Sequence, residues 1–255
     1  MLNKVAIVVG ATGLVGSHLV EELIVATHIS KVITLTRRPI SYNSDKVVNH
    51  VVDFNHLAQH AALFKADILF SCLGTTKKAA GSIAAQRKVD FYYQLKVAEL
   101  AAKHEVHHYL LVSSSGANAN SGNAYLQMKG ELENTVKELP FKRISIIQPS
   151  LLLGERNNEF RIGEKLGSVL LPILCMLPGL RKYRPITGKQ VAIKMCNISK
   201  QSGDGVEYFL SEAFSWKRRL KLKPSFIILK LFKIGVRVEA KFYLSLSFSA
   251  LHMNL

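Results

Sequence analysis

A tyrosine and a lysine four residues apart form the pair of side chains best suited to acid–base chemistry. Tyr125 and Lys129 lie in a run of helical character, and on a helix this spacing places both on one face, about one turn apart. A free phenol ionises only near a pH of about 10, and a neighbouring ammonium group favours its charged form. The pair can therefore give a proton to a carbonyl oxygen, or take one from an alcohol, while a hydride moves at a nicotinamide.

Three serines make this interpretation more specific. Ser113, Ser114 and Ser115 follow an apolar run that is typical of a strand, about a dozen residues before the tyrosine. A hydroxyl at a strand end can hold the oxygen that exchanges the proton. A Tyr-x-x-x-Lys string alone is common by chance, so a packed Tyr125 with a solvated Lys129 remains the alternative.

The start of the chain predicts a nucleotide-binding turn. The apolar run Val5–Val9 passes directly into three spaced glycines, and a helix-forming segment follows. In this order the first glycine makes a tight turn, the second admits phosphate oxygens to the backbone, and the third lets the helix pack on the strand. The helix N-terminus then faces the anion. The residues expected to contact a dinucleotide here are Gly10, Ala11, Thr12, Gly13, Leu14, Val15 and Gly16.

Two arginines predict which dinucleotide binds. The next expected strand, Val32–Thr36, ends in Arg37 and Arg38. An acidic residue at this position favours NAD, whereas an arginine accommodates the 2′-phosphate of NADP. We therefore expect NADP in preference to NAD, with Arg37 better placed than Arg38. A solvated turn before Pro39 is the alternative.

The elements that position these residues alternate along the chain. Short Val/Ile-rich runs are separated by longer amphipathic ones, which is typical of β-α-β units around a parallel sheet. The expected strands are Val5–Val9, Val32–Thr36, Val47–Val52, Asp67–Cys72, Tyr109–Val112, Phe141–Gln148 and Gly205–Phe209. The expected helices extend from the glycines to about Thr27, over Ile83–Lys103, over Ala124–Glu133 and over Lys189–Ile198.

This alternation predicts a doubly wound α/β fold with a parallel sheet, which is a Rossmann fold. A small helical substrate lobe is expected in addition. In such sheets a ligand binds at the carboxyl ends of the strands. Strand ends and the loops after them therefore supply further cofactor contacts. The candidates are Asp53, Phe54, Leu73, Gly74 and Thr75.

These motifs together resemble the short-chain dehydrogenases/reductases, and within them the atypical group around the HIV Tat-interactive oxidoreductase and its bacterial relatives. The resemblance covers about residues 4–209. The Tyr-Leu-Gln-x-Lys-Gly-Glu string is its most specific part. The segments that carry it are Gly10–Gly16, Thr36–Arg38, Cys72–Thr76, Ser113–Ala117 and Tyr125–Glu131.

The resemblance implies roles for single residues. Tyr125 would be the proton donor, and Lys129 would hold the nicotinamide ribose and tune the tyrosine. Ser114 would align the substrate oxygen, with Ser113 and Ser115 as alternatives. The group often binds NADPH and acts on a carbonyl or alcohol, but no particular substrate is implied. The remaining residues that the resemblance places near the cofactor are Ser113, Pro149 and Leu151.

Composition narrows the class of protein. The 255 residues, 48% of them apolar, suffice for one large domain. Three scattered cysteines fit a reducing compartment and argue against a disulfide framework or a zinc site, and no metal is expected. No run has the features of a secretory signal or the length of a membrane span. We therefore expect a cytoplasmic protein.

The last 45 residues differ from the rest and carry +7 of the net charge of +16. The remaining +9 is a moderate excess, and without a nucleic-acid-binding signature no nucleic-acid partner is expected. We expect residues 1–210 to form the domain, with the substrate lobe at about 154–200. Residues 211–255 read as a poorly specified tail from a read-through or frame-shifted end. An amphipathic basic segment near Phe226–Val238 that contacts an anionic membrane is the alternative.

Three functions follow from these patterns. Hydride transfer between NADPH and a carbonyl or alcohol is favoured. A regulator that binds NADPH and a protein partner with little turnover is the alternative. Nucleotide-sugar epimerisation ranks lowest, because it usually needs retained NAD and a larger substrate lobe.

Overall fold

The computed structural model describes residues 3–153 and 185–210. All of them belong to Met1–Ser215, one of the two units into which the chain divides. The expectations for residues 154–184 of the substrate lobe and for the tail at 211–255 lie outside the described residues.

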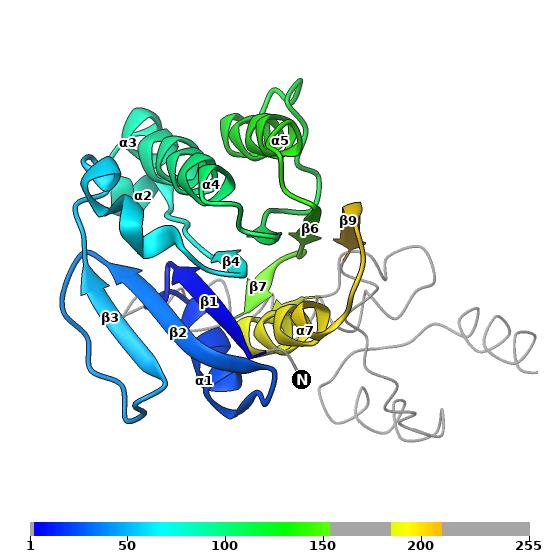
Figure 1. Ribbon diagram of the computed structural model, residues 1–255. Coiled ribbons are helices and arrows are strands. Elements are labelled where there is room, and N and C mark those ends of the chain that lie inside the picture. The colour runs from blue at the N-terminus through cyan, green and yellow to red at the C-terminus, as the bar shows by residue number, and fades with distance from the viewer. Residues whose placement is uncertain (1–2, 154–184, 211–255) are drawn as a thin grey trace, which may run out of the picture. The chain divides into compact units, whose positions relative to one another are not determined.

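Among the described residues, seven strands form one parallel sheet (Figure 1). Their order is β3-β2-β1-β4-β5-β6-β9, and each neighbouring pair is parallel. From β1 the chain adds β2 and β3 on one side and then β4, β5 and β6 on the other. The point between β1 and β4 where this order switches sides is where such folds bind their ligands. The expected doubly wound α/β fold is confirmed. The strands are β1 Lys4–Val9, β2 Ile29–Thr36, β3 Val47–Val51, β4 Ile68–Ser71, β5 His108–Val112, β6 Arg143–Gln148 and β9 Gly205–Leu210.

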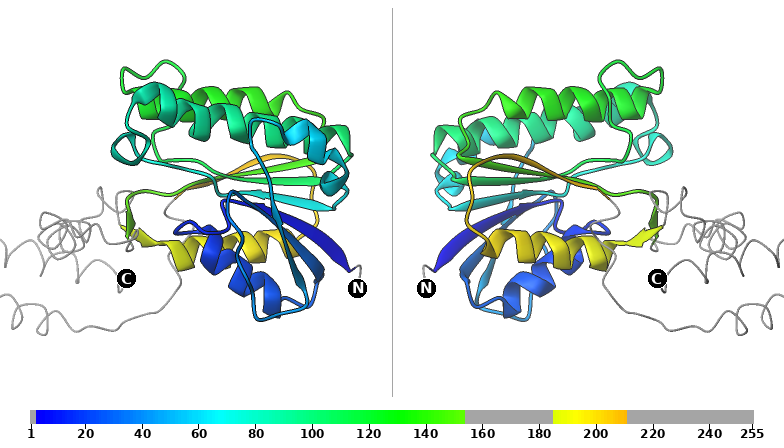
Figure 2. Two further views of the ribbon diagram at one scale, coloured as in Figure 1. Left: turned by 90° about the vertical axis from the view of Figure 1, so that its left-hand side faces the viewer. Right: turned by 90° about the vertical axis from the view of Figure 1, so that its right-hand side faces the viewer.

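Helices cover both faces of this sheet (Figure 2). Successive side chains of a strand point to opposite faces, so Ile7 and Val9 join one apolar core while Ala6 and Val8 join the other. Helices α1 and α7 complete the second core, and α4 and α5 complete the first. The described helical segments are α1 Gly16–Val25, η1 Leu57–Phe64, α2 Lys77–Ala80, α3 Ile83–Arg87, η2 Lys88–Tyr93, α4 Gln94–Lys103, α5 Ala124–Lys137 and α7 Gly188–Lys200.

Helix α7 lies at the end of the range expected for the substrate lobe. The short strand β8, Ile186–Thr187, pairs with β7, Leu152–Leu153, and leads directly into it. The Thr187 hydroxyl caps the helix by accepting a hydrogen bond from the Gln190 N–H. The buried face of α7 packs in the same core as α1, so this helix belongs to the layers around the sheet. No helix in the described part of the chain is long and apolar enough to cross a membrane.

The long helix expected over Ile83–Lys103 is present, but its hydrogen bonding changes part-way. α3 passes into the π-helical segment η2, and η2 passes into α4. On this helix Val97 is buried, whereas Tyr93 is only partly buried. Beside the apolar Phe91, three buried positions from α3 to the start of α4 are polar: Gln86, Asp90 and Gln94. A pattern of apolar residues could not reveal that face.

A chain of polar groups, buried on β5 and β6 and partly exposed on β9, joins these strands at their amino ends. His108 Nε2 lies 2.8 Å from Ser145 Oγ, which donates to Glu207 Oε1 at 2.6 Å. Arg143 forms an ion pair with the same carboxylate at 2.6 Å. Because ligands bind at the opposite edge of such a sheet, these residues stabilise the fold rather than line the site.

We expect the stability of the protein to fall in mild acid because of His108. Burial lowers its pKa from 6.5 to about 3, and the charges of Arg143 and Lys4 act in the same direction. The unfolded chain thus binds a proton below pH 6.5 that the folded chain refuses until about pH 3. This difference removes about 2 kcal/mol of unfolding free energy between roughly pH 7 and pH 5. His108→Gln keeps a donor toward Ser145 and should remove this part of the pH dependence in urea unfolding curves.

The exposed neighbour His107 supplies the control, because its charge is the smallest of the effects that lower the pKa of His108, and His107→Gln should leave most of the pH dependence in place. An equally steep loss of stability in the His108→Gln protein would contradict the assignment.

Candidate active site

The glycine turn after β1 forms a cradle that a side chain would fill. Gly10 has a φ of 77°, in the left-handed region that favours glycine, and a Cβ there would lie 2.5 Å from the carbonyl of Cys72. A Cβ on Gly16 would overlap the Gly10 carbonyl oxygen, so α1 packs directly on the turn. Val15 gives α1 no side-chain cap, and within its first turn the Ser17 N–H donates to the Gly13 carbonyl at 3.0 Å. An uncapped helix start of this kind suits an anion.

The tip of this turn is accessible, whereas its flanks are not. Thr12 is exposed, and Gly13 and Leu14 are partly exposed. Ala11 and Val15 are buried in the core shared with α1 and α7. Of the residues predicted to contact a dinucleotide, Gly10 and the central three thus have the access that contact requires.

A second helix supports the turn from the other side. Gly188, the first residue of α7, lies so close to Leu14 that a Cβ would overlap the Leu14 carbonyl oxygen. The segment that follows residues 154–184 therefore returns to the nucleotide-binding turn. Sequence analysis missed this contact, and its only signal there was a glycine at the start of an expected helix.

Helix α5 starts at a side-chain cap, Asn123, directly before the turn that carries Tyr125. The Asn123 carboxamide oxygen accepts hydrogen bonds from the N–H groups of Tyr125 and Leu126, at 3.0 Å and 3.2 Å. Tyr125 thus lies in the first turn of α5 and is partly exposed. A Cβ on Gly130 would overlap the backbone of Asn118 and Ala119, so this glycine lets the loop after the serines fold back onto α5.

Lys129 extends from α5 to the end of β5. Its Nζ lies 3.4 Å from the carbonyl oxygen of Val112, the last residue of that strand, and 3.3 Å from Asp90 Oδ1. Only 3% of its side chain is exposed. This burial excludes the alternative of a solvated Lys129.

The three serines after β5 have different surroundings. Ser113 is buried, and its hydroxyl donates a short hydrogen bond to Glu133, which also accepts from Gln148 Nε2 at 2.9 Å. The predicted contact of the Ser113 hydroxyl with a cofactor conflicts with this arrangement. Ser114 and Ser115 are both partly exposed, and the Ser114 hydroxyl has only a long contact of 3.5 Å with the Ser115 carbonyl. The structure therefore favours Ser114 or Ser115 over Ser113 as the hydroxyl that could hold a substrate.

The loop after β4 is fastened by the buried polar face of the long helix. Gln86 Nε2 donates to the Thr75 carbonyl at 3.1 Å, and the Thr75 N–H donates to Asp90 Oδ2 at 3.1 Å. At the end of β4, the Ser71 hydroxyl donates to Gln94 Oε1 at 2.8 Å. Sequence analysis missed these three helix residues, although their regular spacing of four was visible. The predicted cofactor contacts in this loop are Leu73, Gly74 and Thr75, all at least partly exposed.

The end of β2 carries the two arginines expected to select the cofactor. Arg37 and Arg38 are exposed, and neither has an ion-pair partner among the described residues. The Thr36 hydroxyl donates to the Arg38 carbonyl at 2.7 Å and shapes the backbone there. Both guanidinium groups are thus free to bind an anion.

The two candidate cofactor contacts after β3, Asp53 and Phe54, are already engaged with neighbours. Asp53 accepts hydrogen bonds from Asn55 and lies 2.7 Å from His56 Nδ1. The backbone N–H of Asn55, followed by His56, lowers the pKa of Asp53. Phe54 is buried, and its ring packs on Tyr93 with centroids 5.4 Å apart. Both residues stiffen the turn after β3, and their contact with a cofactor stays a prediction.

The turn after β6 connects the serine loop to the second small sheet. The Ser115 N–H donates to the Pro149 carbonyl at 2.9 Å, and the Ile186 N–H donates to the Leu151 carbonyl at 2.9 Å. Pro149 is buried and Leu151 is exposed. Of these two predicted cofactor contacts, only Leu151 offers its side chain to solvent.

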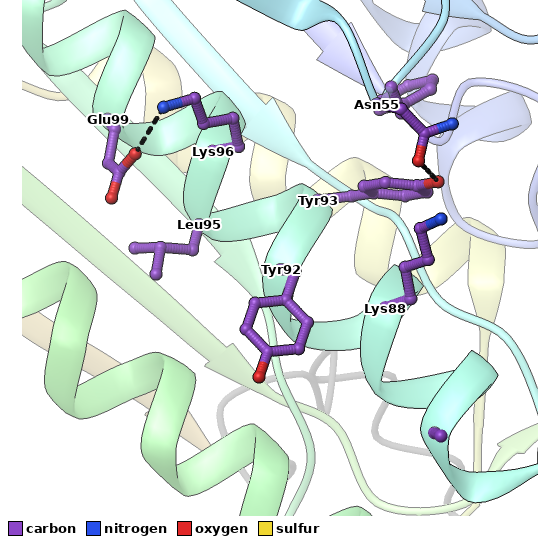
Figure 3. Close-up of a pocket in the computed structure, with 9 residues that line it drawn as sticks. Asn55, Lys88, Tyr92, Tyr93, Leu95, Lys96 and Glu99 are labelled. Atoms are coloured by element: carbon purple, nitrogen blue, oxygen red, sulfur yellow. Dashed lines mark hydrogen bonds and ion pairs between the residues drawn. The ribbon is translucent and has the colours of Figure 1, made fainter.

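An open pocket of about 560 Å³ lies along the other side of the long helix (Figure 3). Lys88, Tyr92, Lys96 and Glu99 line it, and Lys96 pairs with Glu99 at 3.2 Å. Phe54 is the one predicted cofactor residue in its lining, and none of the predicted catalytic residues is there. This pocket is therefore separate from the candidate site.

Comparison with protein families matches residues 6–140 to the NAD dependent epimerase/dehydratase family. The match covers more than half of the chain. The chain belongs to this family.

Individual relatives agree with this assignment. Protein HTATIP2 of Rattus norvegicus is 41% identical over 168 residues, which cover 64% of this chain and 69% of the relative. Protein FMP52-1, mitochondrial, of Scheffersomyces stipitis is 34% identical over 202 residues, which cover 77% of this chain and 88% of the relative. The expected resemblance to the Tat-interactive group is thereby confirmed.

Solved structures of other proteins share the fold of this chain. A UDP-N-acetylglucosamine 4-epimerase from Methanobrevibacter ruminantium aligns with a TM-score of 0.60 at 15% identity, covering 82% of this chain and 77% of that chain. The UDP-glucose 4-epimerase of Thermus thermophilus, in complex with NAD, gives 0.59 at 16% identity, covering 82% and 81%. These neighbours show that the chain shares their Rossmann fold.

The expectation of a cytoplasmic location is wrong. Several relatives, among them the FMP52 proteins of Scheffersomyces stipitis and Saccharomyces cerevisiae, are named mitochondrial. Scattered cysteines indicate only that no disulfide framework is present, and they do not distinguish one reducing compartment from another.

Gly188→Ala should damage the nucleotide-binding turn from outside it. The added Cβ overlaps the Leu14 carbonyl oxygen, so α7 and the turn must move apart, at a cost of about 1–3 kcal/mol in stability. We expect a lower melting temperature and weaker binding of NADPH in titration calorimetry.

Gly122→Ala is the matched control, because no atom lies within 4 Å of the Cβ it would add. Unchanged melting and NADPH affinity in Gly188→Ala would show that α7 does not support the turn.

Proposed function

We propose that this protein is an NADPH-dependent oxidoreductase that acts on a carbonyl or alcohol substrate. The observation that carries the proposal is the position of Lys129. From one turn beyond Tyr125 its Nζ reaches the Val112 carbonyl, directly before the serines. This supports a site in which a phenol, an ammonium group and the Ser114 hydroxyl lie together at the carboxyl edge of the sheet.

The residues present fit a dinucleotide with a 2′-phosphate. The cradle of Gly10, Gly13 and Gly16 has no side chains, and the uncapped start of α1 suits the pyrophosphate. Arg37, with Arg38 beside it, suits the 2′-phosphate, and Lys129 suits the nicotinamide ribose. When bound, NADPH supplies the hydride that the chain's own residues cannot.

The side chains of the site then have separate tasks. The Ser114 hydroxyl would hold the substrate oxygen, and the Tyr125 hydroxyl would donate its proton to that oxygen. The Lys129 ammonium stabilises the phenolate that remains. The carbonyl thereby becomes an alcohol, and the reverse steps oxidise an alcohol.

A nucleotide-sugar epimerase is the second candidate, favoured by the solved structures that hold NAD with UDP-glucose or UDP-glucuronic acid. The two candidates differ in how they hold the cofactor. If the protein is an epimerase, we expect NAD that stays bound through purification. If it is an oxidoreductase, we expect a cofactor that exchanges, with a preference for NADPH. If it is a regulator, we expect NADPH to bind without turnover.

Tyr125→Phe should abolish turnover and spare the cofactor. The ring stays and the proton is lost, so we expect kcat to fall by roughly 100-fold or more. NADPH oxidation with phenanthrenequinone and nitrobenzaldehyde as carbonyl probes measures turnover, and titration calorimetry measures the unchanged dissociation constant for NADPH.

Tyr92→Phe is the control, since it removes a phenol hydroxyl from an exposed ring in the outer pocket. Equal turnover by the Tyr125→Phe and wild-type proteins would exclude Tyr125 as the proton donor. Wild-type protein that binds NADPH but reduces neither probe would favour the regulator.

Arg37→Ala should reduce the preference for NADPH over NADH. A charge-assisted contact with a phosphate is worth about 1.5–3 kcal/mol, so the ratio of the two dissociation constants should change by roughly 10- to 100-fold. Lys31→Ala, which removes a cation near the other end of β2, should leave the ratio as it is. Equal affinities of the wild-type protein for both cofactors would refute the preference.

A further inference from the structure

Asp90 is an acidic side chain buried next to the candidate catalytic lysine. Only 1% of it is exposed, and its Oδ1 lies 3.3 Å from Lys129 Nζ. Its Oδ2 accepts the Thr75 N–H at 3.1 Å. Among the described residues Oδ1 has no hydrogen-bond partner, so its link to Lys129 is one of charge. One carboxylate thus contacts both α5 and the loop after β4.

The π-helical segment η2 presents Asp90 on the inner side of the long helix. Its hydrogen bonds span one residue more than those of an α-helix, which rotates the side chains that follow around the axis. Gln86 and Gln94 share the buried side with Asp90, whereas Lys88 and Tyr92 line the outer pocket (Figure 3). Such segments within α-helices are frequent at functional sites.

Few other charged groups surround Lys129. On α5 itself, Glu133 is buried, but its carboxylate accepts the hydrogen bond from Ser113. After β4, Cys72 approaches Lys129, and burial raises the pKa of its thiol to about 12, so the thiol is neutral. Within the described part of the chain, Asp90 is the carboxylate that balances Lys129.

We propose that Asp90 is a positioning residue that holds the Lys129 ammonium ready for the nicotinamide ribose and couples it to the loop after β4. The inference rests on the proposed function. A buried ammonium without a counter-charge tends to lose its proton or its place, and Asp90 prevents both. The carboxylate also offsets the effect of Lys129 on Tyr125, so its removal must change the pH dependence of turnover.

A double-mutant cycle tests whether Asp90 acts through Lys129. Asp90→Asn keeps an acceptor for the Thr75 N–H and removes the charge. We expect this substitution to raise the dissociation constant for NADPH by about 10-fold in calorimetry, and by less than about 2-fold in a Lys129→Met background. Asp90→Glu retains the charge and should recover most of the affinity.

The pH profile gives a readout that a purely structural role would not move. With phenanthrenequinone as probe, turnover by Asp90→Asn should decline at a lower pH than turnover by the wild type. Without the negative charge, both the phenolate and the neutral lysine form at lower pH.

Glu131→Gln is the matched control. Its ion pair with Arg87 also joins α5 to the long helix, but nearer to solvent. It should leave the NADPH affinity and the pH profile unchanged, and melting curves of all variants report whether the helices still pack.

Two results would overturn the inference alone. One is wild-type NADPH affinity in Asp90→Asn, and the other is an equal loss with and without Lys129, which would assign Asp90 to loop support. Wild-type protein that fails to bind NADPH would instead overturn the proposed function, and this inference with it.

Discussion

Burying a lysine is costly, because the ammonium group loses water that only an opposite charge and polar contacts can replace. Lys129 is 3% exposed, and its charge is met by Asp90 Oδ1 and the Val112 carbonyl. That requirement connects α5, the end of β5 and η2 at one point. Since Asp90 also accepts the Thr75 N–H, the connection extends to the loop after β4. The helix that carries Tyr125 is thereby tied to the part of the site expected to hold a cofactor.

Close backbone contacts complete this framework where charge is not involved. Three glycines within helices lie where a Cβ would overlap a neighbouring backbone: Gly16 on the turn after β1, Gly188 on Leu14 and Gly130 on the serine loop. Each contact joins a helix to a loop, so α1, α7 and α5 are placed relative to the loops that they support. The ion pair of Lys129 with Asp90 positions the candidate catalytic helix. Close backbone contacts at Gly16 and Gly188, which glycine allows because it has no side chain, position the candidate phosphate cradle.

Most of the fold could be predicted from the sequence, because a parallel sheet buries both faces of its strands and leaves continuous apolar runs such as Ile7–Val9. The glycine turn and the Tyr125–Lys129 spacing were equally visible, since both depend on local geometry. What depends on tertiary contacts was not. No local pattern separates the Ser113 hydroxyl from the Ser114 hydroxyl. The difference comes from the hydrogen bond of Ser113 to Glu133, which lies 20 residues further along the chain. The contact of Gly188 with Leu14 joins residues too far apart in the chain for any local pattern.

The helix over residues 83–103 supports the loop after β4 and Lys129, and the difference between its two sides explains why this role was not predicted from the sequence. A search for apolar periodicity assumes that the side facing a sheet is apolar, and for Val97 and the rest of α4 this holds. In the first half the inner side carries Gln86, Asp90 and Gln94, and burying them is tolerable only because each has partners on β4, its loop or α5. Apolar packing would hold this helix with less demand on geometry. A polar row in that place therefore indicates a constraint beyond folding, and the groups that it holds are the loop after β4 and the lysine of the candidate site.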